Sequence, residues 1–262
     1  MLKRNFFLSN IRRYWEIASW KARRSILRAT FQGRDIEYSN FFQNDNVAIF
    51  PELGIVFNRI KKSGNTSVVA FLNDIALGSA YAQSSEVKRS RRLHEASFAT
   101  LLRASTYHSL VVVRNPYRRA LSGFLDKVSP GLDKMYSQFP GFGSPSSEGF
   151  ADFLEYLLLT DYGNNRHFWP QTRLLFQPIN GFDYIVRMEN MVEDMKKVLV
   201  SINIDPQKAS VLHKPHELEL KEPRKITYSS EKSYLFNKKS ISTIEILYKE
   251  DFLRIPYEIG RL

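Results

Sequence analysis

Short, continuous apolar runs recur along the chain and predict buried strands. Residues 47–60 are rich in β-forming side chains, with Pro51 and Gly54 as a turn, and a strand is expected over Ile55–Ile60. Two further runs, Ser109–Val113 and Tyr184–Met188, have the same short apolar pattern. Runs of this length fit strands that are covered on both faces, as in a parallel sheet.

Helical periodicity alternates with these strands. The pattern predicts helices over residues 68–78, 94–106, 117–127, 150–159, 190–200 and 241–250. Asn190 is expected to cap one of them, with Glu193 as its capping-box partner. Residues 128–149 are rich in Gly, Pro and Ser and predict a long loop. Alternating strands and helices predict an α/β fold, in which helices flank a central, mainly parallel sheet and ligands bind beyond the carboxyl ends of its strands.

Composition bounds the size and the chemistry of the protein. The chain has 262 residues, of which 43% are hydrophobic, and carries 38 Lys and Arg against 27 Asp and Glu. A chain of this length and hydrophobic content can bury one sizeable core, and its formal charge of +11 attracts anions. The chain has no cysteine, no His/Asp/Glu cluster with ligand spacing and no apolar run long enough to span a membrane. We therefore expect no metal and a cytoplasmic location.

The first part of the chain is basic and aromatic. We expect residues 1–45 to form a basic helical segment and residues 46–262 to form a single domain. The basic helix fits two roles: packing against the domain, or a peripheral membrane contact through residues 1–30.

Two segments at strand ends have the residues of anion sites. In residues 59–69, RIKKSGNTSVV, a strand leads to Lys61 and Lys62, Gly64 permits a tight turn, and hydroxyl residues open a helix. The spacing is not that of a Walker A loop. In residues 111–124, VVVRNPYRRALSGF, Arg114 follows a buried strand and Ser122 lies on the next helix. An arginine and a hydroxyl suit a phosphate group.

Together these segments resemble the two donor-binding motifs of the sulfotransferases that use 3′-phosphoadenosine-5′-phosphosulfate (PAPS). The match is to the carbohydrate branch, which comprises Golgi-type and bacterial family 2 enzymes. Three further stretches agree in order: NNRHFWPQT (164–172), YIVRMENMVEDM (184–195) and LYKEDFLRIPYE (247–258). The chain departs from the pattern at Lys61, which replaces a proline, at Asn115, which replaces an aspartate, and at Arg118, which replaces an acidic residue.

The resemblance implies a P-loop-kinase-like sulfotransferase fold and transfer of a sulfuryl group from PAPS to a carbohydrate or glycolipid hydroxyl, leaving PAP. It implies that the 3′-phosphate meets Arg114 and Ser122 and that Lys62 stabilises the bridging oxygen. The two turns are expected to face each other across a gap that fits one adenosine bisphosphate. The 5′-phosphosulfate is expected at the first loop, on Lys62, Ser63, Gly64, Asn65, Thr66 and Ser67.

The base that accepts the acceptor's proton is open between His94, which precedes a predicted helix, His167, which lies inside a matched stretch, and a carboxylate such as Glu95. Trp169 and Gln171, beside His167, also suit contact with a sugar. Two other functions compete with that of a sulfotransferase. One is a kinase with a degenerate phosphate loop, and the other is a basic module that binds nucleic acid or an anionic membrane. No recognised nucleic-acid motif is present, so we expect no nucleic-acid partner.

Overall fold

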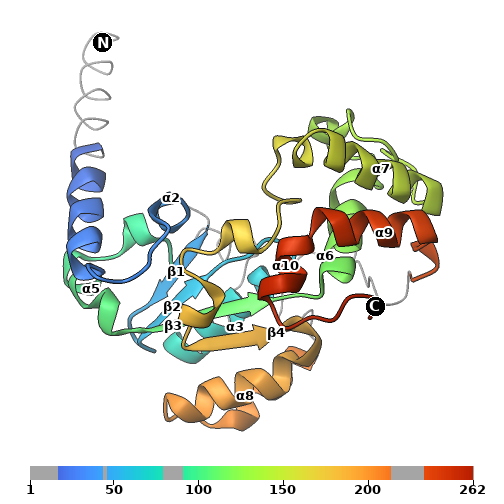
Figure 1. Cartoon of the computed structure of the whole chain (residues 1–262). Helices are drawn as coiled ribbons and strands as arrows, with labels where there is room; N and C mark the ends of the chain where they lie inside the picture. Colours follow the sequence, from blue (N-terminus) through green and yellow to red (C-terminus); the bar gives the residue numbers. More distant parts are fainter. Residues whose placement is uncertain (1–16, 44–45, 79–90, 214–232, 262) are drawn as a thin grey trace, which may run out of the picture.

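A computed structural model describes residues 17–43, 46–78, 91–213 and 233–261 (Figure 1). Within them, four strands form one sheet in the order β1 (Val47–Phe50), β2 (Ile55–Asn58), β3 (His108–Val113) and β4 (Tyr184–Arg187). β1 and β2 pair antiparallel through the Pro51–Gly54 turn, and the other two pairings are parallel. The predicted strands and the α/β class are confirmed.

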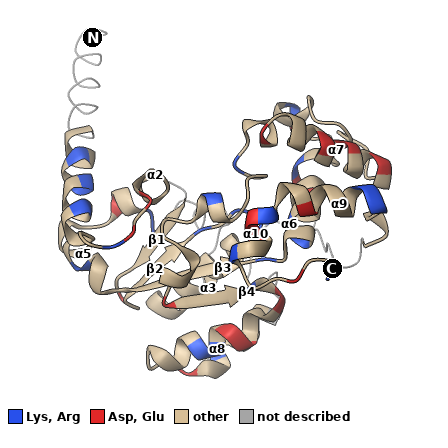
Figure 2. Cartoon of the chain, viewed as in Figure 1, with Lys and Arg blue, Asp and Glu red and all other residues tan. Residues whose placement is uncertain are grey.

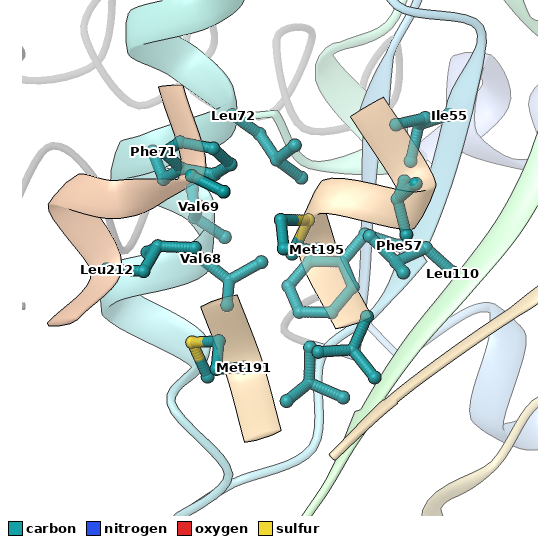
Figure 3. Close-up of a cluster of buried hydrophobic side chains, with 14 of the residues drawn as sticks. Ile55, Phe57, Val68, Val69, Phe71, Leu72, Leu110, Met191, Met195 and Leu212 are labelled. Atoms are coloured by element: carbon teal, nitrogen blue, oxygen red, sulfur yellow. The ribbon is translucent and has the colours of Figure 1, made fainter. Parts of the chain in front are cut away.

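Alternating side chains of the strands send two hydrophobic clusters to opposite faces of the sheet. On one face, Phe57 and Leu110 pack against α3 (Asn65–Leu77) and α8 (Met191–Ser201). Figure 3 shows Val68 of α3 and Met195 of α8 within this cluster. The other face packs against Leu27 of the helix of residues 17–30, α2 (Tyr38–Phe41) and α5 (Phe98–Arg103).

A third cluster, rich in aromatic rings, lies to one side of the sheet and joins four helices (Figure 1). These helices are α6 (Pro116–Gly123), α7 (Ser147–Leu159), α9 (Lys238–Leu247) and α10 (Lys249–Arg254). The long loop predicted over residues 128–149 is present between a π-helical turn, Phe124–Val128, that follows α6 and the start of α7, and it contains a short 3-10 turn, Lys134–Tyr136. Because α6 follows β3 directly, this helical layer holds the second anion segment in place.

Some predicted helices are interrupted. The helix expected over 94–106 is a 3-10 turn, Leu93–Glu95, then α5, then a second 3-10 turn, Ala104–Thr106. Ser97 caps α5, so the chain restarts there instead of continuing. The final predicted helix is split at Tyr248 into α9 and α10.

The capping box predicted at Asn190 was wrong. The Asn190 side chain accepts no hydrogen bond from the start of α8 and instead donates to Asp194 Oδ1 at 2.8 Å. Asp194 also accepts from the backbone N–H of Arg187, so it joins the end of β4 to α8. Across the described ranges, no helix combines the length and the apolar character needed to cross a membrane.

Candidate active site

The first anion segment forms a tight turn between β2 and α3. Lys62 and Gly64 both have left-handed backbone, with φ of 70° and 67°. No side chain caps α3, and its first turn closes with Val68 N–H donating to the Gly64 carbonyl oxygen at 3.0 Å. The first backbone N–H groups of a helix have no partner within it and favour an anion. The segment therefore has a backbone that could receive an anion at the start of α3.

Two of the residues predicted to bind the donor in this loop have side chains that bond within the protein. The Ser63 hydroxyl is buried and donates to Gln171 Oε1 at 3.2 Å. Asn65 Oδ1 accepts from Arg59 Nε at 2.9 Å. These two side chains brace the turn within the protein, whereas Thr66 and Ser67 are half-buried in the first turn of α3.

The second anion segment lies against the first. Arg114 follows β3, and its Nη1 donates to the Lys62 carbonyl oxygen at 3.0 Å. β2 and β3 are adjacent and parallel, so their carboxyl ends bring the two turns to the same edge of the sheet. At this point the two turns touch directly, whereas the sequence led us to expect a gap between them. Arg114 and Ser122 are both buried, with 9% and 3% of their surface exposed.

Burial also changes the electrostatics of the second turn. It lowers the pKa of Arg114 to about 10, although the Glu189 carboxylate opposes this shift. Glu189 is held in place because Oε1 accepts from the Asn115 backbone N–H and Oε2 accepts from the Tyr257 hydroxyl. Asn115 caps α6 by accepting from the backbone N–H groups of Tyr117 and Arg118. It therefore supplies the cap that an aspartate would supply at this position.

Gln171 joins the two turns. Its Oε1 accepts from the Arg114 backbone N–H at 2.8 Å and from Ser63 Oγ, and its Nε2 donates to the Arg114 carbonyl oxygen at 2.8 Å. The side chain is completely buried, so it does not contact a sugar from solution. Arg119 adds a second connection, donating to the carbonyl oxygens of Lys61 and Trp169. Both loops are thus parts of one hydrogen-bonded unit.

The Lys62 ammonium group lies beside a carboxylate that the sequence motifs did not single out. Its Nζ is 3.2 Å from Asp126 Oδ2, on a π-helical turn, Phe124–Val128, that continues α6. Burial lowers the pKa of Lys62 to about 8, and Asp126 opposes the shift. Asp126 lies four residues after Ser122, so helical spacing was the available signal.

The two candidate histidines lie in different surroundings. Burial, reinforced by Lys61 and Lys127, lowers the pKa of His167 to about 3, so its imidazole is neutral at physiological pH. Among the residues that the structure describes, its buried Nδ1 has no hydrogen-bond partner. His94 packs edge-on against Trp20 of the helix of residues 17–30, on the far side of β1, and its Nε2 is 3.7 Å from Glu95. His167 is therefore the histidine in the electrostatic field of Lys62.

A cavity of about 640 Å³ opens beside the second turn, beyond the ends of β3 and β4. Its walls include Asn115, Glu189 and Tyr257, together with three arginines, Arg118, Arg187 and Arg261. Arg118 is one of the positions at which the chain departs from the family pattern. Glu258 also lines the cavity, and Arg187 and Arg261 form ion pairs with Asp194 and Glu258, so the three arginines face two glutamates there. Over the described part of the chain, no group of three or more His, Asp or Glu side chains could hold a metal ion.

Comparison with known proteins places this site in a family. The model of the sulfotransferase family matches residues 45–258, which include every strand of the sheet and both turns. The chain therefore belongs to the sulfotransferase family, and its mixed sheet flanked by helices is the sulfotransferase fold. No curated protein and no solved structure gave a significant match.

Proposed function

We propose that the protein transfers the sulfuryl group of PAPS to a hydroxyl of a carbohydrate or glycolipid, with PAP as the other product. The observation that carries this proposal is the contact between the two turns, in which Arg114 donates to the Lys62 carbonyl oxygen. Membership of the sulfotransferase family supports sulfuryl transfer in general. The resemblance of both motifs to the carbohydrate branch supports the donor and the class of acceptor.

The residues of the site suit both ends of this donor. At one end, the uncapped start of α3 and the Lys62 ammonium group suit the 5′-phosphosulfate. At the other end, Arg114 and Ser122 suit the 3′-phosphate, and the cavity beside them adds room, with Arg118 as a further cation on its wall. Its volume is within the range of small-molecule pockets, about 300–1,000 Å³.

The chemistry that we propose is an in-line displacement, related to phosphoryl transfer. Negative charge grows on the oxygen that bridges phosphorus and sulfur as the bond to sulfur breaks. An ammonium group at Lys62 stabilises that charge, and a group of this kind is commonly worth about 100-fold or more in rate. Neutral His167 can accept the proton of the acceptor hydroxyl, but its low pKa makes it a weak base before the anionic donor binds. Among the three base candidates we favour His167, because its imidazole lies in the electrostatic field of Lys62.

The test is transfer of labelled sulfate from PAPS to a panel of glycans and glycolipids. Lys62→Ala and Arg114→Ala should each abolish transfer while circular dichroism shows a folded protein. Lys239→Ala is the matched control, since this lysine pairs with Asp152 and Glu155 on an exposed surface away from the site. Normal turnover by either site variant would rule out the assignment.

A ligand titration separates the competing functions. A sulfotransferase should bind PAP without magnesium, whereas a degenerate kinase should prefer ATP with magnesium. A basic binding module should bind neither nucleotide, and its affinity for nucleic acid should vanish at moderate salt.

The place of the protein in the cell is a separate part of the proposal. Figure 2 shows Lys and Arg along the helix of residues 17–30, and Lys21, Arg24 and Arg28 on it are exposed. This charge supports a peripheral contact with an anionic membrane; residues 1–16, which the prediction also included, lie outside the described ranges. Flotation with anionic liposomes, with and without residues 1–30, tests the contact, and equal partitioning would exclude it. Cell fractionation tests the predicted cytoplasmic location.

A further inference from the structure

Asp126 lies at the meeting point of two lysines. Lys62 Nζ and Lys127 Nζ are each 3.2 Å from the same oxygen, Asp126 Oδ2. The two ammonium nitrogens are therefore no farther apart than twice that distance. Only 15% of the Lys62 side chain is exposed, so this ion pair is screened far less than a surface pair.

The backbone around Asp126 explains how it reaches Lys62. α6 ends at Gly123, and the chain continues as a π-helical turn, Phe124–Val128, which alters the direction of the side chains that follow. Phe124, Leu125 and Val128 of this turn are buried in the aromatic cluster, which fixes the turn in place. Asp126 is left half-exposed, facing the first loop. π-helical turns of this kind occur frequently at functional sites.

Other charged groups near Lys62 act against its positive charge. Arg114 and Lys127 repel the ammonium group, and burial disfavours its charged form. His167, on the segment between α7 and β4, feels Lys61, Lys62 and Lys127 together and is neutral. Asp126 is the carboxylate that offsets these effects at Lys62. In return, the two lysines outweigh the effect of burial on Asp126 and keep the pKa of its carboxyl below the ordinary value.

We propose that Asp126 is a positioning residue for the transfer reaction, whose carboxylate holds the Lys62 ammonium group in the loop and keeps it protonated. This inference rests on the proposed function, in which charged Lys62 stabilises the leaving bridging oxygen. Asp126 acts through Lys62 and exchanges no proton with either substrate.

The experiment compares the wild type with Asp126→Asn, which keeps the shape and removes the charge. The first readout is the titration of the Lys62 ε-carbon by heteronuclear NMR, assigned by its loss in Lys62→Arg. The second is the pH dependence of kcat/KM for PAPS, which reports ionisations of the free enzyme. Asp152→Asn removes a carboxylate from the exposed pair with Lys239 and is the matched control.

The expected result has a definite sign. Without Asp126, the pKa of Lys62 falls further below about 8, so its proton is lost at lower pH. Removing a charge at this distance shifts a pKa by about 1–3 units. The alkaline limb of kcat/KM should therefore move to lower pH by about one unit or more. The loss of kcat/KM relative to the wild type should become smaller at more acidic pH. Asp152→Asn should leave both readouts unchanged.

Two results would overturn the inference, and they differ. An unchanged Lys62 titration and an unchanged alkaline limb in Asp126→Asn would show that the carboxylate does not control Lys62. A uniform loss of rate at every pH, with Lys62 titrating as in the wild type, would assign Asp126 a purely structural role. Absence of any sulfate transfer by the wild type would instead refute the proposed function. The NMR titration does not depend on turnover, so it would still show whether Asp126 controls the pKa of Lys62.

Discussion

Lys62 carries two energetic costs in one residue. Its backbone is left-handed, which costs a residue with a Cβ roughly 1–2 kcal/mol, and its ammonium group is largely buried. Arg114 holds its carbonyl oxygen, and Asp126 holds its ammonium group. The surrounding contacts therefore maintain a conformation that Lys62 would not adopt alone, as is common at functional sites.

The backbone strain at Lys62 predicts an inverted order of stability for two variants that lack the ammonium group. Both Lys62→Ala and Lys62→Gly lose the ammonium group, but only glycine adopts φ of 70° without strain. Lys62→Gly should therefore have a free energy of unfolding about 1 kcal/mol higher than Lys62→Ala, as measured by urea denaturation.

Lys61 supplies the control for this comparison, because it is not among the residues with positive φ. There the usual order should hold, with Lys61→Ala more stable than Lys61→Gly. A lower stability for Lys62→Gly than for Lys62→Ala would show that the backbone at Lys62 is not strained.

His167 predicts how stability changes with pH. Burial lowers its pKa in the folded protein to about 3, from an ordinary value of 6.5. Between these values the unfolded chain binds a proton that the folded protein does not, so the stability contributed above pH 6.5 is lost as pH falls towards 3. The contribution to the slope approaches about 1.4 kcal/mol per pH unit.

His167→Gln should flatten this loss in urea denaturation measured across mildly acidic pH. The matched variant His108→Gln makes the same substitution at an exposed histidine and controls for the loss of an imidazole at the surface. Equal slopes in the wild type and His167→Gln would show that His167 is not held neutral.

At the scale of elements, α6 connects the sheet to the site. Asn115 ends the turn after β3 and caps the helix, while Pro116 occupies its first turn, where the missing N–H is no loss. Arg119 and Ser122 are then placed by the rotation of this helix, and Arg114 lies directly before its cap. The π-helical turn that follows carries Asp126 to Lys62. The predicted helix over 117–127 had the right place, but its apolar pattern could not reveal the change to π geometry.

The cap of α6 predicts different results for two substitutions of Asn115. Asn115→Ala removes the acceptor for two backbone N–H groups and should lower the free energy of unfolding by about 1 kcal/mol. Asn115→Asp keeps the acceptor and should lower the free energy of unfolding by no more than about half as much as Asn115→Ala does. Asn115→Ala should also weaken PAP binding, measured by calorimetry, because Arg114 precedes the cap.

Ser146 provides a matched cap away from the site, since it caps α7 by accepting from Gly149 N–H. Ser146→Ala should cost a comparable amount of stability and leave the affinity for PAP unchanged. Equal affinities in Asn115→Ala and Ser146→Ala would contradict a link between the cap and the site.

At the scale of the whole molecule, the sequence predicted the features that depend on where the strands end. Apolar runs placed β2 and β3, and adjacency of parallel strands brought Lys62 and Arg114 together. The sequence could not predict that Gln171, far along the chain, bonds to both turns, because such a contact depends on three-dimensional packing. Its motif only suggested contact with a sugar. The arrangement of Asp251 and Gln171 was hidden for the same reason.

Asp251 connects the last helix to the site and gives a prediction for the molecule as a whole. This fully buried carboxylate of α10 accepts from the backbone N–H groups of Gln171 and Thr172 at 2.9 Å and from Thr172 Oγ1. Burial raises its pKa, which Arg119 opposes. Asp251→Ala leaves these donors unsatisfied, at about 1–3 kcal/mol each. It should therefore destabilise the protein and also weaken PAP binding, since Gln171 positions both turns.

Leu247→Ala separates these two effects. Leu247 is a buried residue of the same helical cluster, and its truncation should cost about 2–5 kcal/mol without touching Gln171. Both variants are measured by urea denaturation and by calorimetry with PAP, at a temperature where each is folded. Only Asp251→Ala should bind PAP more weakly than the wild type. If Asp251→Ala lost stability but kept full affinity, the last helix would stabilise the fold without positioning the two turns, and Gln171 would hold them unaided.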